Sequence, residues 1–303
     1  MDDNKIERLT KCPLCKSGLF LNALKIRDHA VSNETFIVCQ CTNCKVRFTN
    51  PRPNISSIDH YYDFPEYYSH NDSAKSLTQL IYQTVRKIAI RKKITLINSL
   101  VSEKGTLLDY GCGTGEFIYR AKTNGWDVSG IEPSSKAREL AAAKVGENVF
   151  FNLDHLSRNQ LFNVITLFHV LEHVHQLRKT VKKLVKHLNP NGYLMIAIPN
   201  PESFDANKYG EDWAGWDVPR HLYHFNRKAM QTFEEVFDLK LVEIKKMPFD
   251  SYYVSLVSET YRKPGNMGIK KYWNAIVSGL LSNKSAKGKS GEYSSNIYLF
   301  KKK

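Results

Sequence analysis

The chain has little of what a membrane or secreted protein needs. No apolar run reaches the roughly 18 residues of a bilayer-spanning helix. Residues 1–11 are polar and charged and lack the apolar core of a secretory signal. Acidic residues are also scarce, with 30 Asp and Glu against 44 Lys and Arg and a net charge of +14. We therefore expect a cytoplasmic protein without a membrane span, whose basic surface either favours anionic partners or holds solvated lysines.

Cysteine is almost absent after residue 45, where only Cys112 occurs, whereas five cysteines come before it. Four of them form two Cys-x-x-Cys pairs, and their thiolates are the predicted ligands of a structural zinc ion: Cys12, Cys15, Cys41 and Cys44. A closed site of four thiolates has no open position for catalysis, and a small module needs such a staple to fold. Cys39 is a competing fourth ligand, and free thiols in a small reduced fold are the alternative.

The composition changes along the chain and predicts three parts. Asn50-Pro51-Arg52-Pro53 marks a boundary, because proline disfavours both helix and strand pairing. The predicted parts are residues 1–50, a zinc-ribbon-like module; 51–104, a linker with aromatic side chains at 61–68 and a helix at about 77–101; and 105–303, the main domain with insertions at 200–226 and 251–292. Residues 282–290 are polar and rich in Lys, Ser and Gly, so we expect them to be mobile.

Strand and helix patterns alternate through the main domain, which predicts an α/β fold with a parallel sheet covered by helices on both faces. Strands are predicted at 106–110, 127–132, 148–152, 162–169, 193–198, 239–245 and 296–300. Helices are predicted at 116–123, 134–145, 176–188, 228–237 and 269–281. The segment at 162–169 is nearly all apolar, as expected of a strand buried on both faces.

A glycine-rich loop, Asp109-Tyr110-Gly111-Cys112-Gly113-Thr114-Gly115, follows the first of these strands. Glycines permit a tight turn and the close approach of a ligand to the backbone. Glu132 ends the next strand, where a carboxylate can bind both hydroxyls of a ribose. Glycines at alternate positions depart from the dinucleotide fingerprint, so an adenosine cofactor without pyrophosphate fits better than NAD. A plain strand-to-helix turn is the alternative.

These motifs resemble the class I S-adenosylmethionine (SAM)-dependent methyltransferases over about residues 105–250. The resemblance rests on the glycine loop, on Ile131-Glu132-Pro133, and on the segments 168–174 and 188–194. It is strongest to the subgroup that includes quinone-biosynthesis O-methyltransferases, and it implies a Rossmann-like sheet of seven strands. The resemblance also implies the cofactor contacts: Asp109, Gly111 and Gly113 at the methionine part, Glu132 at the ribose, Asp154 near the adenine, and Phe168 with His169 beside the sulfonium.

The acceptor of the methyl group needs alignment and, for a hydroxyl or an acidic carbon, a general base. His169 ends a parallel strand, at the sheet edge where such folds bind ligands. The insertion carries Trp213 to Phe225, which we interpret as a lid over the acceptor pocket, with His221 and Tyr223 as catalytic candidates. An aromatic cluster that only packs the insertion down is the alternative. His173 and Glu172 fit a structural role better. A metal site made by His169, His173 and His175 is not favoured.

The leading functional hypothesis is methyl transfer to oxygen or carbon of a small-molecule acceptor, such as a sugar or a quinone. The dispersed lysines favour it over the first alternative, RNA base methylation, in which the aromatics at 61–68 would stack bases. A zinc-bearing interaction subunit without catalytic activity is the second alternative, but the intact glycine loop and Glu132 argue against it.

Overall fold

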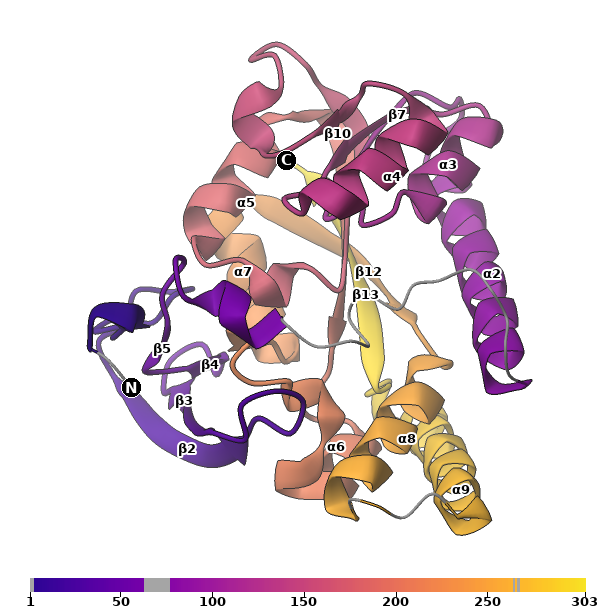
Figure 1. Ribbon diagram of the computed structural model, residues 1–303. Helices are drawn as coiled ribbons and strands as arrows, with labels where there is room; N and C mark the ends of the chain where they lie inside the picture. The colour runs from indigo at the N-terminus through magenta and orange to yellow at the C-terminus, as the bar shows by residue number, and fades with distance from the viewer. Residues whose placement is uncertain (1–2, 63–76, 264, 266–267) are drawn as a thin grey trace.

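The computed structural model describes residues 3–62, 77–263, 265 and 268–303. A four-stranded antiparallel sheet in the order β11-β4-β3-β2 holds the N-terminal segment, and β1 pairs with β5 beside it (Figure 1). These strands are β1 (Ile6–Glu7), β2 (Phe20–Arg27), β3 (Thr35–Cys41), β4 (Arg47–Thr49), β5 (Arg52–Pro53) and β11 (Tyr223–His224). The paired structure of this segment thus continues past residue 50. Of the predicted aromatic patch, Phe64, Tyr67 and Tyr68 lie outside the described residues.

The main sheet has seven strands in the order β12-β13-β10-β9-β6-β7-β8, and only β13 runs antiparallel to its neighbours. Its strands are β6 (Thr106–Tyr110), β7 (Asp127–Ile131), β8 (Val149–Phe150), β9 (Phe162–Phe168), β10 (Leu188–Pro199), β12 (Leu239–Lys246) and β13 (Ser295–Lys302). The chain order reverses between β6 and β9, which is where open α/β sheets bind ligands. The predicted Rossmann-like α/β sheet of seven strands is confirmed.

Helices cover both faces of the sheet, which explains why its central strands are apolar throughout. On one face α2, α3 and α4 pack against Leu107, Val164 and Met195. On the other, α5 and α7 pack against Leu108, Ile165 and the N-terminal module. These helices are α2 (Leu77–Asn98), α3 (Glu116–Thr123), α4 (Ser135–Val145), α5 (Leu177–Lys186) and α7 (Arg227–Phe237). Two further helices, α8 (Asp250–Arg262) and α9 (Ile269–Ser285), pack side by side with the short α6 (Phe204–Tyr209) at one end of the molecule (Figure 1).

The second insertion differs from its prediction in two ways. It contains α8, which the sequence reading did not find, and α9 extends to Ser285 before a π-helical turn at Ala286–Ser290. The segment 282–290 thus begins inside a packed helix, and the expected mobility of the rest stays a prediction. Its serines made the segment look solvent-exposed, but Ser282 is buried and its hydroxyl donates to Asp205 Oδ1 at 2.6 Å. No helix in the described part of the chain is long and apolar enough to span a bilayer.

Candidate functional site

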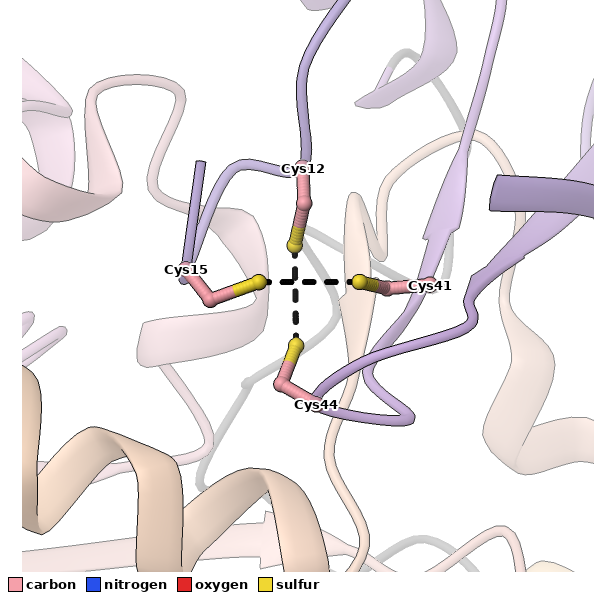
Figure 2. A group of neighbouring side chains, drawn as sticks. All are labelled: Cys12, Cys15, Cys41 and Cys44. Carbon is pink, nitrogen blue, oxygen red and sulfur yellow. Dashed lines mark hydrogen bonds between the residues drawn. The ribbon is translucent and has the colours of Figure 1, made fainter. Parts of the chain in front are cut away.

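Four cysteines of the N-terminal module converge on one point (Figure 2). Cys12 and Cys15 lie in the loop before β2, whereas Cys41 and Cys44 flank the turn between β3 and β4. The two knuckles are the same turn, because Lys16 and Lys45 each follow the second cysteine with positive φ, and each donates its backbone N–H to the first cysteine's carbonyl. The Sγ atoms of Cys12 and Cys44 lie 3.6 Å apart, as do those of Cys15 and Cys41. This compact set of four thiols fits a tetrahedral metal ion.

Cys39 is not part of this group. Its Sγ lies 3.3 Å from Asn22 Oδ1 and 3.7 Å from the carbonyl oxygen of Asn50. Because side chains alternate across a strand, Cys39 and Cys41 of β3 share one face, and only Cys41, at the strand end, reaches the knuckle. The geometry therefore favours Cys41 over Cys39 as the fourth ligand.

The first insertion is fastened to the N-terminal module. Its strand β11 pairs with β4, and Thr49 donates its hydroxyl to the carbonyl of His221. Arg220 is 2% exposed and its guanidinium bonds both Asp28 and Asp217. The aromatic side chains of the insertion are also buried: Trp213, Trp216, Tyr223 and Phe225. Apolar packing and buried ion pairs hold residues 213–225 inside the molecule, which agrees with the alternative of an aromatic cluster that packs the insertion down. Their role as a lid over the acceptor pocket stays a prediction.

Tyr223 and His221 have their polar atoms engaged in this packing. The Tyr223 hydroxyl donates to the carbonyl of His175 and accepts from Arg52 Nη1, each at 2.9 Å. His221 Nδ1 lies 2.9 Å from the carbonyl oxygen of Gly215. The donor atoms of Glu172, His173 and His221 gather within 4.8 Å of one another, whereas the disfavoured trio of His169, His173 and His175 does not gather. The Tyr223 hydroxyl thus links β11 to β5 and to the segment that contains His175. The His221 ring lies close to Glu172.

The glycine loop turns sharply between β6 and α3. Gly111, Gly113 and Gly115 have φ angles of +80°, +54° and +80°, a region that favours glycine. A Cβ on Gly111 would lie 2.5 Å from the Val170 side chain, whereas a Cβ on Gly113 would meet nothing within 4 Å. The loop therefore packs tightly on the β9 side and leaves the backbone at Gly113 open to a ligand.

Two carboxylates flank this opening. Glu132, just after β7, accepts from the backbone N–H of Gly113 at 2.8 Å and from that of Ser134 at 2.9 Å. Asp109 lies one residue before the end of β6 and is buried, and Thr166 donates its hydroxyl to Asp109 Oδ1 at 2.6 Å. Burial raises the pKa of Asp109 to about 6, although Thr166 and Lys93 oppose this. A buried carboxylate of this kind gains from a cationic neighbour, such as an ammonium or a sulfonium.

A cation already lies beside Asp109. Lys93 extends from α2 and places its ammonium 3.9 Å from the ring centroid of Phe168. Burial lowers the pKa of Lys93, and the charges of Asp250 and Asp109 oppose that shift. The Phe168 ring itself is held edge-on by Phe117, with 5.1 Å between centroids. The ring face of Phe168 and the nearby carboxylates of Asp109 and Asp250 suit a bound cation. The residues therefore fit the sulfonium and the adenosyl group of SAM.

His169 lies next to Phe168 at the carboxyl end of β9, with a φ of +58°. Its Nε2 is 3.2 Å from Asp250 Oδ2, and its Nδ1 is 3.6 Å from Glu172 Oε1. Burial lowers the pKa of His169, but the two carboxylates outweigh burial and raise it to about 9. Sequence reasoning missed Asp250 and Lys93. Pro248 followed by Asp250 was a usable helix-start signal for α8, but nothing in the sequence showed that this start faces His169.

Asp154 lies apart from these groups. It follows β8 in a short helical turn, where its exposed carboxylate pairs with Lys183 of α5. Its placement at the adenine stays a prediction. The structure therefore brings together Asp109, the glycine loop, Glu132, Phe168 and His169. His221 adjoins this group through Glu172, whereas Asp154 and Tyr223 lie outside it.

Comparisons with known proteins agree with this layout. A ubiquinone biosynthesis O-methyltransferase of Rickettsia conorii is 30% identical over 46% of this chain and 52% of its own length. The chain thus spans about half the length of that relative. Another, of Rickettsia canadensis, is 27% identical over 55% of this chain and 75% of its own length. The solved geranyl diphosphate C-methyltransferase of Streptomyces coelicolor aligns over 78% of this chain and 88% of its own at 13% identity, with a TM-score of 0.48, which is too weak to support an argument.

The sequence profile of the methyltransferase domain family matches residues 82–244, more than half of the 303-residue chain. The match begins in α2 and ends in β12, so it includes every residue of the glycine loop and of the carboxyl end of β9. The chain therefore belongs to the methyltransferase domain family, and its predicted assignment as a class I SAM-dependent methyltransferase is confirmed.

Proposed function

We propose that the protein transfers the methyl group of SAM to an oxygen or an acidic carbon of a small-molecule acceptor at the carboxyl end of β9. The observation that supports this most is the adjacency of Phe168, which carries a cation on its ring, and His169, which is held by two carboxylates. Bound SAM supplies an already activated methyl group, so the chain's task is to align an acceptor and to receive its proton.

In this proposal the glycine loop and the two carboxylates hold the cofactor. The open backbone at Gly113 admits the methionine part together with Asp109 and Gly111, and Glu132 takes the ribose hydroxyls. A new cation at Phe168 has to share or displace the position of the Lys93 ammonium. Asp154 stays the candidate at the adenine, but its pairing with Lys183 gives it a separate structural role.

His169 is the proposed proton acceptor. Its two carboxylate partners keep the imidazole largely protonated at neutral pH, so the free base becomes abundant only as the pH approaches 9. An acceptor with an acidic hydroxyl suits such a base, because that hydroxyl needs less help to lose its proton. The name of the Rickettsia relatives, ubiquinone biosynthesis O-methyltransferase, supports a hydroxyl on a quinone-type ring as the first acceptor to test.

We further propose that the four cysteines hold a structural zinc ion, which requires reduced thiols and therefore suits the cytoplasm. RNA methylation has less support than small-molecule methylation. Tyr61 donates its hydroxyl to Glu34 and is 7% exposed, so its ring is not free for base stacking.

The cofactor assignment is tested by calorimetric titration of SAM into two variants. Gly113→Arg should abolish binding, because its side chain fills the open space above the loop, and Glu132→Ala should weaken it. The matched control is Gly146→Arg, since Gly146 also has positive φ and faces open space, but ends α4. Unchanged SAM affinity in both loop variants would show that this loop is not the cofactor site.

The acceptor class is tested with isotope-labelled SAM. The intact protein is incubated with separate fractions of small molecules and of RNA, and the label is followed into each. Small-molecule labelling that disappears in Gly113→Arg supports the proposal. Labelling of RNA alone would replace it with the first alternative, and SAM binding without any transfer would favour the non-catalytic one.

A further inference from the structure

Helix α9 carries an apolar stripe that faces away from the molecule. Its side chains recur at helical spacing on one face and are exposed to 88%, 65%, 48% and 54% in chain order: Ile269, Trp273, Ile276 and Leu280. Tyr272 and Leu281 widen the stripe. Single exposed apolar residues are ordinary, but a continuous stripe on one helix indicates a surface that another body covers.

The opposite face of α9 is fixed, so the stripe cannot turn inward. Small side chains there pack against α8: Ala275, Ser278, Gly279 and Ser282. A Cβ on Gly279 would lie 2.5 Å from the Tyr252 ring, so the two helices are in close contact. Ser251 donates its hydroxyl to the carbonyl of Gly279, and Asn283 Nδ2 donates to the carbonyl of Pro248.

The charges on α9 itself and on its flanking segments are all positive, and the acidic side chain beside them is Glu259 of α8, which accepts from Asn274 Nδ2 at 3.3 Å. Residues 263–291 contain no Asp or Glu, and lysines lie at both ends of α9: Lys263, Lys270, Lys271, Lys284 and Lys287. An apolar helix face with tryptophan and flanking lysines is typical of helices that lie in the plane of a membrane interface. Lysine is depleted from protein–protein interfaces, so the flanking lysines favour lipid over a protein partner.

We propose that α9 docks the protein on an anionic lipid bilayer, with Trp273, Ile276 and Leu280 inserted at the headgroup boundary and the lysines against anionic headgroups. Helix α9 lies on the surface in this arrangement and does not span it. The pair of helices α8 and α9 also contacts the candidate site. Helix α8 begins at Asp250, the partner of His169, and α9 bonds Pro248 and Ser251 on either side of Asp250.

The test uses the full chain without SAM and vesicles of phosphatidylcholine with and without 30% phosphatidylglycerol, a proportion chosen as about that of an anionic membrane surface. Sedimentation with anionic vesicles should be at least about tenfold stronger than with neutral ones, and should weaken in high salt. Trp273 gives a direct reading, because the other three tryptophans are buried: Trp126, Trp213 and Trp216. Its fluorescence should shift to the blue on binding and be quenched by brominated lipid, and Trp273→Phe should remove both signals.

Leu280→Glu should reduce vesicle binding about tenfold or more. The matched control is Leu21→Glu, because Leu21 is similarly exposed but lies on β2 of the N-terminal module. Gly113→Arg should still bind vesicles, which separates this proposal from the cofactor assignment. The proposal is overturned if anionic vesicles do not bind the intact protein, if Leu21→Glu loses binding as fully as Leu280→Glu, or if the stripe instead joins two copies in a dimer that Leu280→Glu dissolves.

Discussion

The insertion at 213–225 and the glycine loop at 109–115 both look rich in chemistry in the sequence, but the structure uses them differently. Two prominent polar groups of the insertion already have partners, because Arg220 bonds two carboxylates and the Tyr223 hydroxyl both donates and accepts. The buried Nε2 of His224 has no hydrogen-bond partner among the described residues. The loop leaves space at Gly113 and a cation site at Phe168. The comparison teaches that residue type alone does not identify a reacting group. Open space and unmet bonding capacity do so better.

The largest expected effect is the loss of the metal from the N-terminal module, to which the insertion is fastened. Cys41→Ser should release the metal and unfold the N-terminal module, because structural zinc contributes on the order of 10 kcal/mol in small modules. Cys39→Ser is the matched control and should keep the metal, since the Cys39 thiol faces Asn22. Metal content per chain and thermal unfolding measure both. If Cys39→Ser lost the metal and Cys41→Ser kept it, the ligand set would be wrong.

Arg220→Ala tests whether the insertion stabilises the contact between the main domain and the N-terminal module. Removing one partner of a buried ion pair leaves Asp28 uncompensated, which costs about 3–5 kcal/mol of unfolding free energy. Arg262→Ala, which breaks a partly exposed pair with Asp212, should cost less than about 1 kcal/mol. Urea denaturation measures both variants. Equal losses of unfolding free energy in the two variants would mean that burial does not strengthen the ion pairs of Arg220.

The next effect concerns His169 in the candidate site. Because Asp250 helps to hold the pKa of His169 near 9, Asp250→Asn should lower that pKa, as followed by the imidazole signals in an NMR titration. Asp154→Asn, a carboxylate change far from His169, should leave it unchanged. His169→Asn identifies the signal that belongs to His169.

The same pairing makes stability depend on pH. A histidine with a pKa raised on folding stabilises the protein fully below pH 6.5, and this contribution is lost as the pH rises through about 9. Asp250→Asn should therefore reduce the loss of stability between pH 6.5 and 9. A His169 pKa near 6.5 in the unmodified protein would contradict both expectations.

The sequence predicted the parts of the fold that depend on local pattern. The apolar run at β9, the spacing of the cysteine pairs and the glycine loop each reflect a constraint that acts within a few residues, and each prediction agrees with the structure. Asp109 and Glu132 could be placed at the loop for the same reason, since strand ends in a parallel sheet share one edge.

The contacts that the sequence did not predict join distant segments. Strand β11 pairs with β4 across more than 170 residues. This pairing makes part of the insertion a strand of the N-terminal sheet. Asp250 reaches His169 because β12 and β13 place the start of α8 at the carboxyl end of β9. Periodicity and residue type contain no signal for either contact, because both depend on how the completed sheet positions its ends.

The smallest effect decides the role of Tyr223. Tyr223→Phe keeps the ring and removes a hydroxyl that donates to His175 and accepts from Arg52, so we expect about 1–3 kcal/mol of lost stability. Methyl transfer by the folded fraction should be unchanged, because this hydroxyl has no contact with Phe168 or His169. Activity and urea denaturation are measured on the same sample, and Tyr253→Phe, an exposed tyrosine on α8, controls for the ring substitution. A fall in turnover of tenfold or more at unchanged stability would restore Tyr223 as a catalytic group and would break the distinction between the insertion and the site on which the comparison rests.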